Sequence, residues 1–184
     1  GFERCATPSV DSRAASDHRY AQAIVLYPYV ALALARLAIV DSRRADGADG
    51  PNPGAKARQA AEDALRLSPS LGEGHMALGL CFYEVDKNYS AALKEFSIAA
   101  ATWPNEPDIL TYIAGVYRRQ ERWRESIATF QRAQILDPRN VHVNDFAAAN
   151  YLLVRDWGAA TECYERAQEI AADSTYAKIG LAYL

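Results

Sequence analysis

The side chains best suited to metal binding or nucleophilic catalysis are scattered along this sequence. The histidines and cysteines are His18, His75, His142, Cys5, Cys81 and Cys163. They form none of the short spacings, such as Cys-x2-Cys, in which these residues bind zinc or make a redox pair. We therefore expect reduced thiols and no metal centre.

Motifs for phosphate transfer, hydrolysis and metal-dependent proteolysis are also absent from the sequence. It contains no Gly-rich phosphate loop, no Gly-x-Ser-x-Gly and no His-Glu-x2-His. Neighbouring carboxylates such as Glu62 and Asp63 lie in an amphipathic segment, where a solvated helix face is their ordinary role. The sequence therefore predicts neither an enzyme nor a cofactor.

Two segments concentrate charged residues. Residues 41–54 are rich in Asp and Gly but lack the alternating ligands and closing Glu of an EF-hand calcium loop, so we expect a solvated loop. A basic cluster consists of Arg118, Arg119, Arg122 and Arg124. This cluster is compatible with an acidic partner segment and equally with a solvated helix end.

Composition narrows the class of molecule further. The chain has 184 residues, 50% of them hydrophobic, which suffices for a continuous core. Its net charge of -3 argues against a nucleic-acid binder, which needs a basic surface. No apolar run reaches the roughly 18–20 residues of a membrane span, and no secretory signal is recognisable. We expect a cytoplasmic protein by default, although a chain that begins with Gly1 leaves room for a removed signal.

Four columns of residues recur along the chain with one period. The prolines Pro28, Pro69, Pro104 and Pro138 are separated by a longer first interval and then by intervals of about 34 residues. Three further columns repeat in phase with them: Ala23, Ala64, Ala99, Ala133 and Ala167; Tyr20, Ala61, Phe96, Phe130 and Tyr164; Ala38, Gly79, Ala114, Ala148 and Ala182. A shared period of this length indicates an array of repeated helical units.

The residues that carry this period resemble the tetratricopeptide-repeat family, whose pattern runs Trp-x2-Leu-Gly-x2-Tyr, then Ala-x3-Phe, then Pro. The best match is His75-x2-Leu78-Gly79-x2-Phe82, then Ala92-x3-Phe96 and Pro104. Later units match with Ile113-Ala114-x2-Tyr117 and Ala147-Ala148-x2-Tyr151, but the second of these has Ala172 in place of the proline. More loosely, the chain resembles repeat regions attached to bacterial multidomain signalling proteins.

The resemblance implies an all-α fold, a right-handed superhelical solenoid of antiparallel helix pairs. Small residues let the two helices of a pair approach, large residues fill the groove between pairs, and proline ends the second helix. The expected helices span residues 12–26, 31–43, 55–67, 71–85, 89–102, 107–120, 123–136, 141–154, 157–171 and 175–184.

The same register divides the chain into one array, 1–184. Residues 1–27 hold the second helix of a truncated unit, and residues 175–184 the first helix of another. The complete units are 28–69, 70–106, 107–140 and 141–174. We place a loop insertion at 41–54, Pro28 in an inter-repeat turn, and one extra residue in the internal turn at 86–88. The apolar terminal helix, with Leu181 and Leu184, predicts self-association.

In this family the first helix of each pair lines a concave groove where ligands usually bind. Mapped onto this register, the groove residues are Arg36, Ile39, Met76, Leu80, Tyr83, Tyr112, Arg119, Asp145, Ala149, Asn150 and Leu153. The positions of the family's two-carboxylate clamp hold Ala35, Ile39, Met76, Leu80, Thr111 and Gly115 instead of Lys and Asn. The mixed apolar, aromatic and Arg lining favours an extended or helical peptide instead.

The resemblance therefore predicts a non-catalytic scaffold that binds a protein or peptide partner through the groove, without nucleic acid or membrane. One alternative stays open: a structural, oligomerisation or intramolecular docking module of a larger bacterial signalling protein. RNA binding by helical-pair repeats is opposed by the acidic pI of about 5.6.

Overall fold

The computed structural model describes residues 29–42 and 53–184, and their secondary structure is entirely helical. A helix occupies residues 29–42. It is followed by α2 (Pro53–Leu67), α3 (Gly72–Leu80) with the π-helical turn η1 (Cys81–Val85), α4 (Tyr89–Thr102), α5 (Pro107–Arg119), α6 (Trp123–Leu136), α7 (Val141–Leu153), α8 (Trp157–Ile170) and α9 (Thr175–Tyr183). The all-α prediction is confirmed, and the predicted spans from residue 55 onward agree closely with these helices at both ends.

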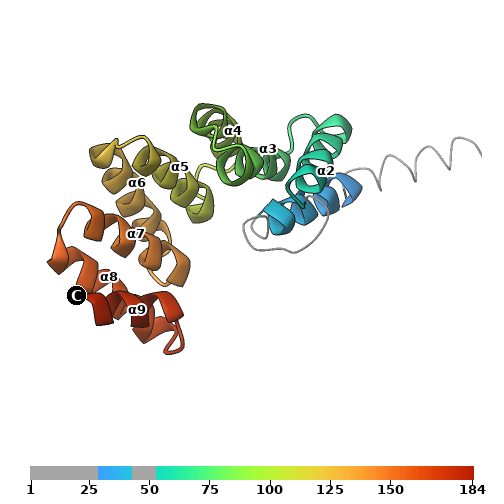
Figure 1. The fold of residues 1–184 in the computed structure, drawn as a ribbon. Coiled ribbons are helices and arrows are strands. Elements are labelled where there is room, and N and C mark those ends of the chain that lie inside the picture. Colours follow the sequence, from blue (N-terminus) through green and yellow to red (C-terminus); the bar gives the residue numbers. More distant parts are fainter. Residues whose placement is uncertain (1–28, 43–52) are drawn as a thin grey trace, which may run out of the picture.

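Successive helices pack as antiparallel pairs, and the pairs stack into a curved solenoid. Figure 1 shows α3 and α5 on the inner side of the curve, with their partners α4 and α6 outside. Each pair also contacts the next one, because α4 packs on α5, α6 on α7 and α8 on α9. No described helix combines the length and apolar character that crossing a bilayer requires.

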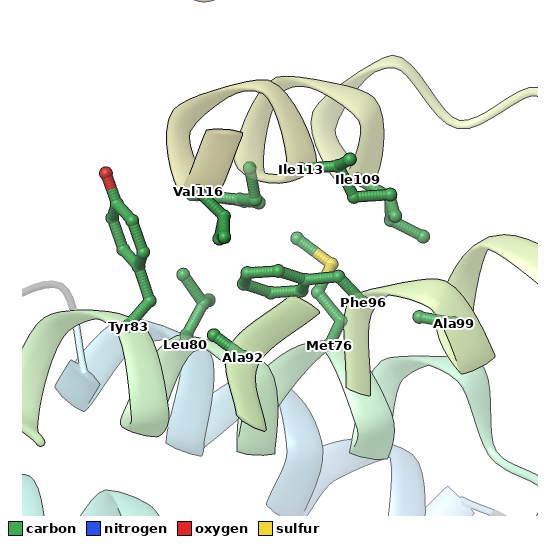
Figure 2. Close-up of a cluster of buried hydrophobic side chains, with 10 residues drawn as sticks. Met76, Leu80, Tyr83, Ala92, Phe96, Ala99, Ile109, Ile113 and Val116 are labelled. Carbon is green, nitrogen blue, oxygen red and sulfur yellow. The ribbon is translucent and has the colours of Figure 1, made fainter. Parts of the chain in front are cut away.

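The repeat columns form the core of this stack. In the large column, Ala61, Phe96 and Phe130 are fully buried, and Tyr164 is 5% exposed. Figure 2 shows Phe96 of α4 among side chains of α3 and α5, including Leu80 and Ile113. Truncating such a residue to alanine typically costs about 3–5 kcal/mol. The predicted role of the large column in joining neighbouring pairs is thus confirmed.

The turns between repeats share one hydrogen-bond pattern. In each, the last residue of the turn donates its backbone N–H to the carbonyl three residues earlier. The bonds are Leu71 to Ser68, Glu106 to Trp103, Asn140 to Asp137 and Ser174 to Ala171, at 2.9–3.3 Å. The first three turns contain Pro69, Pro104 or Pro138, whereas the fourth has Ala172. The proline therefore reinforces a turn that the chain also forms without it.

The three described turns inside repeats each place a non-glycine residue in the left-handed region. These residues are Lys87, Glu121 and Arg155, with φ of 53°, 59° and 61°. Each stands two positions before the aromatic residue that opens the second helix, Tyr89, Trp123 or Trp157. The three turns therefore have equal length, so the predicted extra residue at 86–88 is wrong.

The extra residue lies instead in η1, inside the first helix. The Asp86 N–H donates to the Cys81 carbonyl five residues back, at 3.2 Å. The Asn88 N–H then donates to the Phe82 carbonyl at 2.8 Å. The equivalent bonds in the later units, from Arg122 to Tyr117 and from Asp156 to Tyr151, each span one residue fewer. A single π-helical turn absorbs one added residue without changing the turn that follows.

The predicted loop at 41–54 overlaps a described helix at each end, and residues 43–52 lie outside the described residues. Asp41 and Ser42 belong to the helix at 29–42, where the Ser42 hydroxyl donates to the Ala38 carbonyl at 2.8 Å. Pro53 opens α2, because a proline is tolerated at a helix start, where its missing N–H has no partner. The predicted helix at 12–26, Pro28, His18 and Cys5 lie outside the described residues.

At α9, apolar side chains face outward. The exposed fractions are 65% for Ile179, 78% for Tyr183 and 44% for Leu184. Leu181, one of the two leucines on which the predicted self-association rests, packs against the cluster that includes Tyr151 and Tyr164, because it lies on the helix face turned toward α7 and α8. Self-association through this helix stays a prediction.

Candidate partner-binding site

One pocket of about 300 Å³ brings together side chains of three successive repeats and of α9. Its lining consists of Tyr83, Glu84, Thr111, Tyr112, Gly115, Arg118, Arg119, His142, Phe146 and Tyr176. These residues come from η1 and from the first helices of the following pairs, the helices predicted to line the groove. Three predicted groove residues, Tyr83, Tyr112 and Arg119, therefore lie in a single pocket.

Helix α5 supplies the central strip of this pocket. Its five lining residues follow at positions i, i+1, i+4, i+7 and i+8, which is one face of an α-helix. The hydroxyl of Thr111 donates to the Pro107 carbonyl at 2.9 Å, so it is satisfied within the helix. The polar groups that α5 offers to the pocket are therefore chiefly the guanidinium groups of Arg118 and Arg119.

The aromatic rings form a ladder across the repeats. Phe96 stacks on Tyr112 with centroids 5.5 Å apart, Tyr112 lies 6.3 Å from His142, and His142 lies 4.4 Å from the Phe146 ring. Tyr176 of α9, 70% exposed, extends this aromatic lining at the pocket's edge. Since Phe96 is fully buried, the ladder anchors the pocket in the core.

Tyr83 enters the pocket from η1. A Cβ atom added at Gly115 would lie 3.2 Å from the Tyr83 hydroxyl oxygen, so the missing side chain leaves room for the tyrosine. A hydrogen bond with Tyr83 is the largest cause that raises the pKa of Arg119, followed by its coulombic interaction with the same residue. The tyrosine thus lies close to Arg119, the last residue of α5, at the pocket.

The basic cluster predicted from sequence is divided by the fold. Arg118 lies over the Phe146 ring at 5.9 Å and lines the pocket. Arg122 lies over the Tyr117 ring at 4.3 Å and pairs with Glu125 at 3.0 Å. Of the four arginines, only Arg118 and Arg119 line this pocket.

Several predicted groove residues are core residues instead. Leu80 is fully buried and Met76 is 7% exposed, both packed around Phe96. Asn150 is 1% exposed, and its amide oxygen lies 3.1 Å from the Ser126 hydroxyl, which donates to the Ala114 carbonyl at 2.8 Å. These predictions are corrected, because the first helices turn part of the predicted face toward their neighbours.

Asp145 is likewise buried, at 6% exposure, beneath the start of α9. Its Oδ2 accepts a hydrogen bond from the Ser174 hydroxyl at 3.1 Å, while its Oδ1 accepts none from any residue that the structure describes. Burial raises the pKa of this carboxyl group, and the bond from Ser174 opposes the rise. Asp145 therefore joins α7 to the α8–α9 turn and does not line the pocket.

The remaining predicted groove residues lie away from the pocket. Arg36 and Leu153 are exposed, whereas Ile39 and Ala149 are half-buried. Ile39 packs against two core clusters, one of which contains Phe96. None of the four lines the pocket.

Two pocket residues outside the predicted groove set follow the period of the repeat. Phe146 follows Tyr112 by one period of the repeat, and Tyr176 follows His142 by the same interval, so each pair occupies one column. Projecting Tyr112 through one period would have identified Phe146. Arg118 belongs to the predicted basic cluster and lies outside the predicted set of groove residues.

The histidine and cysteines singled out from sequence have structural environments. His75 bonds through Nδ1 to Glu95 at 2.8 Å and through Nε2 to the Pro69 carbonyl at 3.0 Å. Cys81 and Cys163 are buried thiols, and burial raises the pKa of both. Within 29–42 and 53–184, no three His, Cys, Asp or Glu residues are grouped so as to hold a metal ion.

Comparison with known proteins supports the repeat assignment. The tetratricopeptide-repeat family model matches residues 54–107 and 85–141. A solved structure of PilF from Pseudomonas aeruginosa superposes with a TM-score of 0.72 at 19% identity, covering 85% of this chain and 68% of that one. No curated protein matches the sequence. The family match, the repeat spacing and the stacked helix pairs identify residues 54–141 as tetratricopeptide repeats.

Proposed function

We propose that this protein binds a short segment of a protein partner in the pocket centred on α5. Tetratricopeptide repeats are generally protein-interaction modules and are usually non-catalytic. The observation that carries the proposal is the convergence of Tyr83, Tyr112, Arg119 and their neighbours from successive repeats on one cavity. Aromatic and Arg side chains dominate the energetic centres of protein interfaces.

The pocket has the size and the surroundings of a peptide site. Its volume of about 300 Å³ is at the lower end of the range for ligand sites, which suits one or two side chains of an extended segment. Its aromatic floor is fixed by Phe96 and Tyr112, so little side-chain entropy is lost on binding. The exposed ring of Tyr176 offers additional contact area at its edge.

The test uses variants that change the pocket and spare the core. Tyr83 and Tyr112 are each 7% exposed and pack around Phe96, so their truncation would also destabilise the fold. Arg119→Ala with Tyr176→Ala removes two accessible contacts, and Gly115→Leu places a side chain in the cavity beside the Tyr83 hydroxyl. Tyr183→Ala is the matched control, an exposed tyrosine of α9 outside the pocket.

A phage-displayed library of random twelve-residue peptides is selected on the wild-type protein, and the affinities of the selected peptides are measured by fluorescence polarisation. We expect the double variant and Gly115→Leu to weaken binding by about 2 kcal/mol or more, roughly thirtyfold, as truncated anchors do. The Tyr183→Ala variant should bind like the wild type. Selected peptides that bind all the variants with unchanged affinity would place the interaction site elsewhere.

A further inference from the structure

Building on the proposed pocket, we infer that its ligand is an acidic segment in which a carboxylate stands beside an aromatic side chain. Two guanidinium groups, Arg118 and Arg119, face a pocket whose other walls are largely aromatic. Charge and aromatic surface occur together in a cavity large enough for one or two side chains. The carboxylate of the ligand would bind the two guanidinium groups, and its aromatic side chain would pack on the aromatic walls.

The pocket arginines differ from several others in their partners. Arg58, Arg66 and Arg122 each form an ion pair with a carboxylate of the same chain. Among the residues that the structure describes, neither Arg118 nor Arg119 does so. Arg118 lies over the Phe146 ring, and the proximity of Tyr83 is the largest cause that raises the pKa of Arg119. An external anion can therefore reach both guanidinium groups, although the charge of Glu84 also acts on Arg119 and contributes to raising its pKa.

The geometry of these contacts suits a carboxylate. A guanidinium over an aromatic ring or held by a tyrosine is restricted in orientation, but keeps several N–H donors directed away from that contact. A carboxylate accepts two such donors side by side, and charge-assisted bonds of this kind are stronger than neutral ones. The partial enclosure by Tyr83, Tyr112 and Phe146 reduces solvent screening compared with an open surface.

Glu84 is the acidic residue of the lining, and its charge works against an acidic ligand. However, Glu84 already lies 3.7 Å from the ammonium group of Lys87 in the following turn. The charges of Arg118 and Arg119 outweigh that of Glu84, which also lies near Lys87, so the net charge of the pocket lining is positive. This local sign is opposite to the net charge of -3 of the whole chain.

The test measures the affinities of defined probes by fluorescence polarisation. The probes are fluorescein-labelled twelve-residue Gly-Ser peptides, amidated at the C-terminus, with a central Glu-Phe-Glu, Gln-Phe-Gln or Glu-Ala-Glu. A fourth probe carries Gln-Phe-Gln at its end with a free C-terminal carboxylate, which separates a terminal from a side-chain carboxylate. We expect Glu-Phe-Glu to bind about tenfold or more tightly than Gln-Phe-Gln at low salt, with a smaller difference at high salt.

The double variant Arg118→Gln/Arg119→Gln should remove the preference for Glu over Gln. The matched control Arg139→Gln/Arg166→Gln changes two exposed arginines outside the pocket and should retain it. Circular dichroism verifies that both variants are folded. Probes that bind in the pocket with equal affinity for Glu and Gln would overturn the acidic ligand and leave the proposed function standing.

Other outcomes separate the two proposals. If all probes bind Gly115→Leu as tightly as the wild type, the pocket itself is not the site and the proposed function fails. If the free C-terminal probe binds and Glu-Phe-Glu does not, the carboxylate is recognised as a chain terminus rather than as an acidic side chain, and the inference of an acidic segment fails. Absence of binding by every probe at millimolar concentration also overturns it.

Discussion

At the scale of single residues, two glycines of the first helices have different surroundings. A Cβ atom at Gly79 would lie 2.6 Å from two ring carbons of Phe96, which is fully buried. A Cβ atom at Gly115 would meet only Tyr83, with its hydroxyl oxygen nearest at 3.2 Å, at the edge of a cavity. Gly79 is therefore required by close packing of a helix pair, whereas Gly115 only borders the pocket.

This difference predicts opposite effects of the same substitution. Replacing a helical glycine with alanine gains about 1 kcal/mol of helix propensity, whereas overpacking a core costs about 1–3 kcal/mol. We expect Gly79→Ala to lower the free energy of unfolding by about 1 kcal/mol and Gly115→Ala to leave it unchanged or raise it. Urea denaturation followed by circular dichroism measures both. Equal destabilisation by the two variants would contradict the prediction.

At the scale of elements, η1 accommodates one residue more than the later repeats contain. The repeats that begin at 107 and 141 follow the regular period and have no π-helical turn in their first helices. In the earlier unit, η1 restores the register before the turn at Lys87 and directs Tyr83 toward α5. π-Helical turns of this kind frequently occur at functional sites.

Deleting Glu84 should therefore give a folded protein in which η1 becomes ordinary α-helix. The helix turns by about 100° per residue, so a deletion in a helix without a spare residue rotates everything beyond it out of register. Leu152 provides that control, because it stands at the corresponding position of α7. We expect the thermal midpoint to fall far more for the Leu152 deletion than for the Glu84 deletion, as measured by circular dichroism. Similar losses would show that η1 is required for folding.

At the scale of the whole molecule, the described part of the stack has two large core clusters that meet at α5. Phe96 belongs to the first and Tyr164 to the second, while Ile113 and Ala114, adjacent on α5, belong to one each. Repeat arrays derive their stability from such nearest-neighbour contacts. A helix between two packed neighbours should therefore open less readily than α9, whose contacts are with α7 and α8.

This arrangement predicts a gradient of hydrogen exchange along the chain. Amides of α5 and α6 should exchange at least about tenfold more slowly than those of α9, because local opening of α9 disrupts fewer neighbours. Mass spectrometry of peptic fragments measures the rates. Equal protection of α5, α6 and α9 would indicate that the array opens as one cooperative unit.

The sequence by itself determined the repeat and the helices. Small residues such as Gly79, large ones such as Phe96 and turn prolines such as Pro104 recur at a nearly fixed interval. Each acts within its own unit or on the next one, so their roles can be deduced from spacing. The same reasoning placed Tyr83, Tyr112 and Arg119, which line the pocket, in the groove, but it treated the predicted groove residues as one accessible face.

Only the tertiary structure decided which of those side chains remain accessible. Leu80 and Tyr83 are three residues apart, in α3 and η1. Leu80 is buried in the cluster around Phe96, whereas Tyr83 also lines the pocket. The outcome depends on the angle between neighbouring pairs and on the rotation introduced by η1. Neither quantity is contained in the spacing of residues along one chain, because both arise from the packing of side chains between helices.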